Sequence, residues 1–501
     1  MKRIAIIGAG LGGLTAGNLL ARKGHAVTIF ETYKRPGGYT AGFRKKGFYF
    51  ESGTLAYESS GIMDKLLEDA GVADKVRRVR KRDRWVSPQF DFLFGSLDDF
   101  KKAVYAGFPE HKAGLDGYFG LIDKYYGLMK PLIVEPLPFQ YSGLRAIRAM
   151  LPYLRLGPKY MRFSKAYRDR TVEDLADAHF PRDTPVHRLF CGLGYPKMGI
   201  DGLVGFFLTM SEDYWHMADG MQALADALAA SFQGAGGTLR LGTRVDRILT
   251  RAGAAVGVAC GQERIEADVV ISAGDYKKTF LSLLDDPTIV PAPQMDKIRR
   301  APVSEGVFTV YLGLAIPPAD LERAMRAYSV RYSPLAEEPA ACDPGDPDHF
   351  AKRGFGLYSP SLVNPALAPE GKSSLMIQAV SPTGWQDGWH KDDRPAYLAL
   401  KEKVAATLIE RAEAIVPGLR AAVEFQDAAT PLTYERYTAN TDGATSAWSW
   451  DPNKKFYDGG LTKMSVATPV RNLLIGSCWV AQIGGIPSAI AAGYMCARKI
   501  G

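Results

Sequence analysis

Four glycines near the start of the chain have a spacing that could serve a phosphate-bearing ligand. Gly8, Gly10, Gly12 and Gly13 lie close together, and a carboxylate, Glu31, follows them after a second apolar run. Glycines at such positions allow a tight turn, let the backbone approach a pyrophosphate, and let a helix pack closely on a strand. An acid about 20 residues further on is placed to accept hydrogen bonds from an adenosine ribose. The residue types therefore indicate a dinucleotide site.

The elements around these glycines are the ones that such a site needs. Residues 4–7 form a short β-branched run typical of a buried parallel strand, residues 14–23 show helical periodicity, and residues 26–30 form a second strand that ends at Glu31. The start of the helix would offer free N–H groups and the positive end of its dipole to phosphates. The order strand, glycine turn, helix, strand and acid thus predicts where the phosphates bind.

The last part of the chain contains a second glycine-rich helix start. A short apolar run ends at Gly476, and Gly484, Gly485 and Ile486 precede a helical pattern that contains several small residues. Backbone N–H groups at this position can point at a ligand. The alternative is a plain strand–loop–helix unit that only closes the sheet. Together with the N-terminal glycines, the segment favours a contribution to the same cofactor site.

Two further strands are predicted in the middle of the chain, within residues 237–248 and 267–273, and the second follows a hairpin. We therefore expect an α/β protein whose nucleotide-binding domain is discontinuous, formed by residues 1–105, 215–300 and 465–501. Residues 106–214 and 301–464 would form a substrate-binding domain with a mixed sheet and a helical cap.

A second glycine pair after Glu31 makes the motif more specific. Gly37 and Gly38 follow Arg35, and Gly53 ends the run GFYFESG. This resembles the extended motif of the glutathione-reductase and amine-oxidase superfamily of flavoproteins. The resemblance implies a Rossmann-type FAD-binding domain with FAD as cofactor. It places the backbone at Gly37 and Gly38 near the pyrophosphate, with Arg35 among the cofactor-binding residues, Gly53 near the flavin ring, and the backbone of Val245 against the adenine. It also implies that the strand within 267–273 returns to the nucleotide-binding domain.

Three further runs narrow the resemblance. They are DYWHMADGMQAL at 213–224, PSLVNPALAPEGK at 360–372 and TPLTYERYT at 430–438. Together with both ends of the chain they look like the family of phytoene desaturases, carotenoid isomerases and retinol saturases. The resemblance implies an FAD-dependent oxidoreductase that desaturates, saturates or isomerises conjugated double bonds in a lipophilic isoprenoid, carotenoid-like or retinoid-like. The chain departs from the family pattern at residues 218–220 and 477–482, which leaves substrate and reaction direction open.

Candidate catalytic residues are few, because a flavin itself performs hydride transfer. His216 is a candidate proton donor, with a hydrogen-bonded structural histidine as the alternative. Cys478 and Trp479 are expected near the flavin, and Cys478 is a candidate redox-active thiol with an inert buried thiol as the alternative. The histidines and cysteines lack metal-ligand spacing, so we expect no metal. The substrate side should be apolar, and its aromatic candidates, each with core packing as the alternative, are Tyr57, Phe206, Phe207, Trp215, Trp385, Trp389, Trp448 and Trp450.

Composition limits the remaining choices. Apolar residues make up 47% and charged residues 23% of the chain, and the net charge is +8. These values are typical of a globular cytoplasmic protein, and no apolar stretch is long enough to span a bilayer. The basic runs at 77–84 and 145–170 predict a solvated face, with an anionic membrane surface as the alternative, and match no nucleic-acid-binding motif. The amphipathic part of residues 118–170 is compatible with a membrane-surface helix, a lid or an ordinary surface helix.

The functional expectation has two rivals. One is a flavin amine oxidase acting on a smaller polar substrate, and the other is a flavin-binding chaperone or assembly protein without turnover. A second nucleotide fingerprint is absent from the sequence, so a dedicated NADPH domain is not expected. Oxygen or a quinone would then accept the electrons of a net oxidation.

Overall fold

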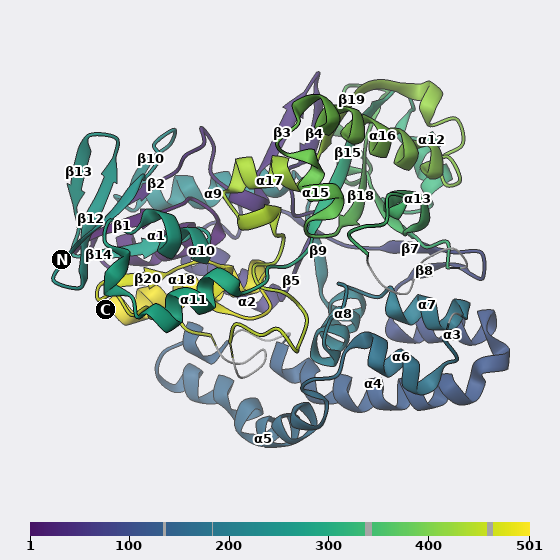
Figure 1. Ribbon diagram of the computed structural model, residues 1–501, viewed down its shortest axis with the longest axis horizontal. Coiled ribbons are helices and arrows are strands. Elements are labelled where there is room, and N and C mark those ends of the chain that lie inside the picture. The colour runs from purple at the N-terminus through teal and green to yellow at the C-terminus, as the bar shows by residue number, and fades with distance from the viewer. Residues whose placement is uncertain (134–136, 183, 336–342, 458–463) are drawn as a thin grey trace.

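The computed structural model describes residues 1–133, 137–182, 184–335, 343–457 and 464–501. A five-stranded parallel sheet forms the left part of the molecule in Figure 1. Its strand order is β10-β2-β1-β14-β20, and both neighbours of β1 pair with it in parallel. The strands are β1 (Arg3–Ile7), β2 (Ala26–Phe30), β10 (Thr238–Arg240), β14 (Val269–Ser272) and β20 (Leu473–Ile475). Three stretches far apart in the sequence thus share one sheet.

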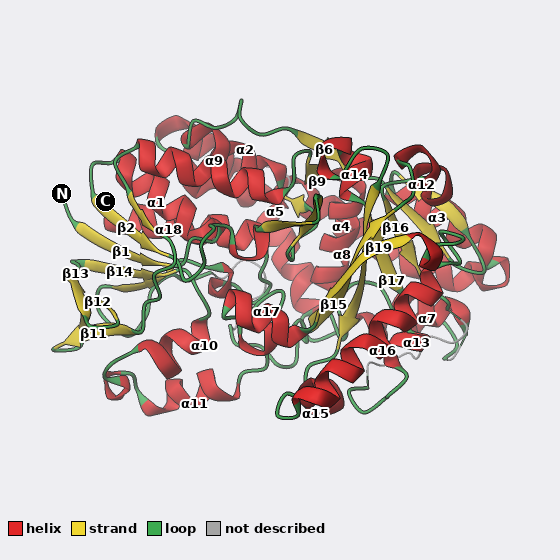
Figure 2. Ribbon diagram, turned by 90° about the horizontal axis from the view of Figure 1, so that it is seen from above, coloured by secondary structure: helices red, strands yellow, loops and turns green. Residues whose placement is uncertain are grey.

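Helices cover both faces of this sheet. In Figure 2, α1 (Leu11–Arg22), α9 (Met221–Gly234) and α18 (Ile486–Ile500) lie on one side, and α10 (Tyr276–Lys278) and α11 (Ala292–Arg300) lie on the other. Small residues let α1 and α18 approach: a Cβ added at Gly493 would lie 2.5 Å from the Thr15 Cβ. A small antiparallel sheet extends beside the parallel one and consists of β11 (Arg247–Arg251), β12 (Ala254–Cys260) and β13 (Glu263–Glu266).

A seven-stranded mixed sheet forms a second layer, with the order β19-β15-β18-β17-β16-β7-β8. Its strands are β7 (Asp83–Val86), β8 (Asp91–Phe94), β15 (Gly306–Leu314), β16 (Ser329–Tyr332), β17 (Phe355–Tyr358), β18 (Ser373–Ser381) and β19 (Val423–Ala429). The parallel pairing of β7 with β16 and the pairing of β8 with β7 join residues 83–94 to this sheet, and these residues fall within the range 1–105 that the sequence assigns to the nucleotide-binding domain. The helices beside it are α12 (Pro318–Met325), α13 (His349–Lys352), α14 (Pro360–Val363), α15 (Trp385–His390), α16 (Arg394–Ala412) and α17 (Pro431–Thr438).

A group of helices occupies the bottom of Figure 1, from α5 at the centre and left to the helices below the seven-stranded sheet at the right, and encloses an aromatic core of its own. Its members are α3 (Leu97–Gly107), α4 (Lys112–Ile133), α5 (Gly143–Tyr167), α6 (Val172–His179), α7 (Pro185–Cys191) and α8 (Ile200–Glu212). Within the described part of the chain, no helix is both long and apolar enough to cross a bilayer.

A short sheet of order β5-β9-β6 joins the three parts. It consists of β5 (Tyr57–Glu58), β6 (Arg78–Arg80) and β9 (Tyr214–Met217), while α2 (Ser60–Asp69) and the hairpin of β3 (Gly42–Lys45) and β4 (Phe48–Glu51) complete the N-terminal third. Because β9 follows the helical group directly and precedes α9, this sheet holds the nucleotide-type sheet and the helical group in fixed relation. The division into two domains stays a prediction.

Candidate functional site

The N-terminal glycine loop lies between β1 and α1, where the backbone turns sharply. Gly8 has φ +98°, and its N–H donates to the Phe30 carbonyl at 2.8 Å. Gly10 is the N-terminal cap of α1, and no side chain caps this helix start. The first turn of α1 therefore presents backbone N–H groups and a positive dipole end where the sequence predicts phosphate binding.

The four glycines of this loop differ in the space around them. A Cβ at Gly12 would lie 2.0 Å from the Gly476 carbonyl oxygen, and one at Gly13 would lie 2.1 Å from the Gly8 carbonyl oxygen. At Gly10 the added atom would meet no atom of the protein within 4 Å. Gly12 and Gly13 are thus needed for packing, whereas Gly10 borders open space that a ligand can enter.

Glu31 closes the loop from the end of β2. Its carboxylate accepts the N–H groups of Ala9 and Tyr33, each at 2.9 Å. Burial raises the pKa of Glu31 above its ordinary value, and the two backbone N–H groups oppose that rise. The N–H of Thr243 also donates to the Glu31 carbonyl oxygen at 2.8 Å, which brings the segment before the buried Val245 to the same place. The residues predicted to hold the adenosine half therefore converge around Glu31.

The second glycine pair packs directly on the first loop. Gly37 donates its N–H to the Ala9 carbonyl at 2.9 Å, and a Cβ at Gly38 would lie 3.5 Å from the Gly10 Cα. The nearby Arg35 is exposed. This arrangement gives the open space beside Gly10 a second backbone wall, which is the placement that the sequence predicts for a pyrophosphate.

The C-terminal segment meets the N-terminal loop. Gly476 follows β20 and touches the position of Gly12, as described above, and Gly485 is the N-terminal cap of α18 with φ +131°. No side chain caps α18 either. A Cβ at Gly484 would lie 2.4 Å from the Ser446 carbonyl oxygen, so this position requires glycine. Two uncapped helix starts, from opposite ends of the chain, thus lie close together, and their joint contribution to one cofactor site stays a prediction.

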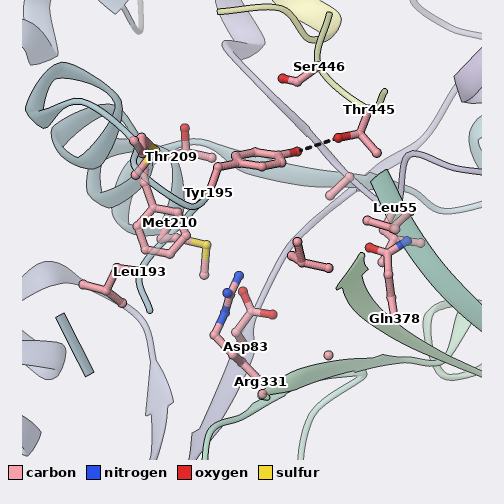
Figure 3. Close-up of a pocket in the computed structure, with 18 of the residues that line it drawn as sticks. Leu55, Asp83, Leu193, Tyr195, Thr209, Met210, Arg331, Gln378, Thr445 and Ser446 are labelled. Carbon is pink, nitrogen blue, oxygen red and sulfur yellow. Dashed lines mark hydrogen bonds between the residues drawn. The ribbon is translucent and has the colours of Figure 1, made fainter. Parts of the chain in front are cut away.

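A cavity of about 620 Å³ begins at this site. Four of the predicted cofactor residues line it: Gly53, Gly484, Gly485 and Ile486. The remaining walls come from α7, α8 and the loop between them, from β7, and from β16 to β18 of the seven-stranded sheet. Figure 3 shows Leu193, Tyr195 and Met210 on the side of the helical group and Gln378 on the side of the sheet. The cavity therefore lies between the three parts of the molecule, beside the predicted position of the flavin ring.

Charged residues stand on the wall that β7 and β16 form. Lys81 and Asp83 form a buried ion pair, and Figure 3 shows Asp83 and Arg331 both pointing into the cavity. Burial works against ionisation of Asp83, but the Lys81 ammonium, its hydrogen bonds and Arg331 hold its pKa below the ordinary value. Burial lowers the pKa of Lys81. Within the run 77–84, expected as a solvated face, Arg77, Arg78 and Arg82 are exposed, whereas Lys81 and Asp83 contribute a charged wall to the cavity.

Glu58 is a carboxyl group of the cavity wall that the sequence did not predict. It lines the cavity from β5, and a Cβ at Gly485 would lie 3.4 Å from its Oε1. Burial raises the pKa of Glu58 to about 7. A carboxyl group with such a pKa can hold or release a proton near neutral pH beside the start of α18. Glu58 stands only five residues after Gly53, which is the one signal in the sequence that could have drawn attention to it.

The three catalytic candidates from the sequence do not line the cavity in the described part of the chain. The His216 ring is buried, its Nδ1 lies 2.6 Å from the Leu55 carbonyl oxygen, and burial lowers its pKa to about 3. Burial raises the pKa of the Cys478 thiol to about 11. Trp479 packs edge-on against Trp448 with the ring centres 4.8 Å apart. Catalytic roles for these residues stay predictions.

Of the aromatic residues predicted to line the substrate side, some line the cavity and others lie elsewhere. Trp450 and Phe206 line the cavity, and Tyr195 stacks on Trp450 with the ring centres 4.8 Å apart. Trp385 and Trp389 belong to the core between the seven-stranded sheet and α16. Four more are absent from the cavity wall, namely Tyr57, Phe207, Trp215 and Trp448. The wall is supplemented by Trp85 and Phe90, which the sequence analysis did not single out.

Comparison with characterised proteins gives relatives that match over most of the chain. A 4,4'-diapophytoene desaturase from Methylomonas is 24% identical over 91% of this chain and 88% of its own length. A phytoene desaturase from Rhodobacter capsulatus is 25% identical over 100% of this chain and 94% of its own length. A prolycopene isomerase from an Oncidium hybrid is 24% identical over 99% of this chain and 83% of its own length.

Solved structures share the fold at lower identity. An oxidoreductase from Methanosarcina mazei superposes with a TM-score of 0.62 at 16% identity, covering 99% of this chain and 100% of that one. A variant of putrescine oxidase superposes with a TM-score of 0.64 at 16% identity, covering 100% of this chain and 98% of that one. These likenesses confirm the predicted fold class, a Rossmann-type FAD-binding domain of the amine-oxidase type with further sheets and helices.

The family model described as flavin containing amine oxidoreductase matches residues 11–501. FAD suits the residues present, because the two uncapped helix starts and the open space at Gly10 can receive a pyrophosphate, and Glu31 faces the same loop. The match confirms the predicted cofactor and the predicted class of enzyme, an FAD-dependent oxidoreductase. The chain belongs to the flavin containing amine oxidoreductase family.

Proposed function

We propose that this enzyme acts on carbon–carbon bonds of a long lipophilic isoprenoid, carotenoid-like or retinoid-like, by desaturation, saturation or isomerisation. The observation that carries the proposal is the cavity beside Gly53 and Gly485, which has space for a chain-like molecule and walls rich in apolar and aromatic side chains. The names of the matching desaturases and isomerases point the same way.

FAD, when bound, supplies hydride transfer at the substrate carbon atoms. The protein would hold the part of the substrate that reacts with the flavin near Gly53 and Gly484–Ile486. Aromatic side chains of the cavity wall, such as Trp450 and Tyr195, would exclude water from it. Glu58 would hold a proton beside the same loop, because burial keeps its pKa near neutrality. An isomerisation needs only such a proton and a cycling flavin, whereas a net desaturation also needs oxygen or a quinone as the final electron acceptor.

The test is an anaerobic titration of the FAD-loaded protein with carotenoids, retinoids and amines, followed by the flavin absorption and by chromatography of the polyene. Bleaching by an isoprenoid, or isomerised product without bleaching, is the expected result. Bleaching by amines alone would instead favour an amine oxidase. Binding without reaction by every compound would favour a flavin-binding chaperone or assembly protein.

We also propose that α5 contacts an anionic membrane surface, from which a lipophilic substrate could be drawn. The helix exposes large apolar side chains, and basic residues accompany them at Arg145, Arg148 and Arg155. The exposed apolar residues on α5 are Leu144, Ile147, Met150, Leu151, Leu154 and Met161. The end of α5 also adjoins the cavity, because Ser164 donates to Asp201, a lining residue, at 3.1 Å.

A further inference from the structure

Arg331 is a charged residue on the cavity wall, and an apolar substrate would offer its guanidinium no hydrogen-bond acceptor. It lies on β16, is half-buried, and points into the cavity (Figure 3). Its guanidinium carbon lies 5.2 Å from the centre of the Trp85 ring and 5.4 Å from that of Phe206. Among the described residues, Arg331 forms no salt bridge. Two aromatic faces thus orient its guanidinium, and its hydrogen-bonding edge is left for a ligand.

The neighbouring charges do not cancel that of Arg331. Asp83, the nearest carboxylate on this wall, is already paired with Lys81. Two cations, Lys81 and Arg331, and one anion, Asp83, therefore stand together on β7, β16 and the loop before β7, and Arg353 adds a further cation to the cavity wall. The other carboxyl groups of the cavity wall, Glu58, Glu173 and Asp201, form no ion pair with Arg331 within the described chain. Each of them has a raised pKa because of burial.

The Arg331 guanidinium lies across the cavity from the position predicted for the flavin ring. In Figure 3, Arg331 and Asp83 lie across the cavity from Thr445 and Ser446. The Ser446 carbonyl oxygen is in turn the atom that leaves no room for a Cβ at Gly484. A substrate whose reacting bonds lie beside the flavin loop would therefore bring another part of its length to Arg331.

A hydrocarbon at this wall would remove water from the guanidinium without replacing its hydrogen bonds, which is unfavourable. A carboxylate would replace them with two parallel, charge-assisted hydrogen bonds. The Asp83 carboxylate, which interacts with Arg331, would repel the several negative charges of a diphosphate more strongly than the one charge of a carboxylate.

We infer that the substrate carries a carboxylate, and that Arg331 binds it. This inference rests on the proposed function, since it assigns an acidic end group to the isoprenoid substrate of the same cavity. Arg331 is then a specificity-determining residue that separates isoprenoid acids from hydrocarbons, alcohols and esters, and the reaction that supplies the substrate must have oxidised one terminus of the isoprenoid.

The experiment uses the FAD-loaded protein with all-trans-retinoic acid, its methyl ester and geranylgeranyl diphosphate as probes. Binding is followed by the change in the flavin spectrum and by quenching of tryptophan fluorescence, to which Trp85 beside Arg331 contributes. Because hydrogen bonds to a charged group are strong, we expect the acid to bind about tenfold or more tightly than the ester. Equal affinity of acid and ester, or tighter binding of the diphosphate than of the acid, would overturn the inference.

Variants test whether Arg331 is the residue that causes the preference for the acid over the ester. Arg331→Met should weaken binding of the acid by about tenfold or more and leave the ester unchanged, and Arg331→Lys should keep part of the preference because it keeps the charge but not the planar fork. Arg323→Met on the exposed face of α12 is the matched control and should bind both probes as the wild type does. A preference for the acid that survives in Arg331→Met would contradict the assignment. If neutral isoprenoids react and the acid has no advantage, only the carboxylate inference fails; if no isoprenoid perturbs the flavin, the proposed function fails with it.

Discussion

Around Gly10, Gly12 and Gly13 the backbone itself forms the binding site, whereas around Lys81, Asp83 and Arg331 the cavity wall consists of charged side chains. In the first region almost any side chain would collide with a carbonyl oxygen or occupy the ligand's space. In the second region each residue can be exchanged in principle, and the identity of the side chains decides what binds. The cofactor end of the site therefore tolerates little sequence variation, while the substrate end can diverge within one fold.

The largest expected effect comes from filling the backbone site. Gly12→Val places side-chain atoms where even a Cβ would lie 2.0 Å from the Gly476 carbonyl oxygen. We expect a loss of about 3 kcal/mol in the free energy of unfolding, measured by urea denaturation, together with loss of bound FAD. The control is Gly127→Ala on α4, where a Cβ meets nothing within 4 Å, so stability should not fall. If both variants kept the stability and the bound FAD of the wild type, the glycine loop would not be the less variable of the two regions.

A second effect concerns the carboxyl group of the cavity. Glu58 has a pKa of about 7 in the folded protein against an ordinary value of 4.5, so its folded form binds protons more strongly than its unfolded form. Wild-type stability should therefore fall as pH rises from about 4.5 to 7 and then level off. Glu58→Gln should be more stable than the wild type by about 2–3 kcal/mol at pH 8 and equal to it near pH 4.5. Denaturant titrations at both pH values measure this difference in the free energy of unfolding. Glu68 is exposed, so the control Glu68→Gln should differ from the wild type by the same amount at both pH values.

A third experiment separates packing from ligand space within the glycine loop. Gly10→Ala adds an atom that touches nothing in the protein, so the apoprotein should keep its melting temperature. The same atom would occupy the space predicted for the pyrophosphate, and FAD affinity should drop by about tenfold, or about 1.4 kcal/mol. Flavin fluorescence titration of the apoprotein gives the affinity. Unchanged affinity would mean that the phosphates lie elsewhere.

The smallest effect on stability is expected at α5. Replacing Leu144, Leu151 and Leu154 by serine should change the free energy of unfolding by no more than about 0.5 kcal/mol, since these side chains are exposed. Binding to vesicles with anionic lipids, measured by co-sedimentation, should nevertheless be lost. The matched control carries serine at three exposed leucines elsewhere, Leu93, Leu241 and Leu398, and should still sediment with the vesicles. Equal sedimentation of both triple variants would contradict the membrane proposal.

The glycine loop and Glu31 could be predicted from the sequence because their geometry is local. A turn, a helix start and the end of the next strand fix them within about thirty residues. Glu58, Lys81 and Arg331 could not be predicted, because the pairing of β5 with β9 and of β7 with β16 brings them to one cavity from distant segments. The run at 77–84 also concealed its role, since charge in a sequence does not say which side chains become buried.

The sheet order β10-β2-β1-β14-β20 has a consequence for biosynthesis. β14, the last of the other four strands to be synthesised, ends at Ser272, and β20 begins only at Leu473, so during translation β14 has an unpaired edge and α1 lacks its contact with α18. A chain truncated before residue 472 should therefore aggregate and should not form a soluble, partly folded domain. Cofactor loading would then belong to the final stage of maturation, which makes the nascent protein dependent on chaperones for an unusually long time.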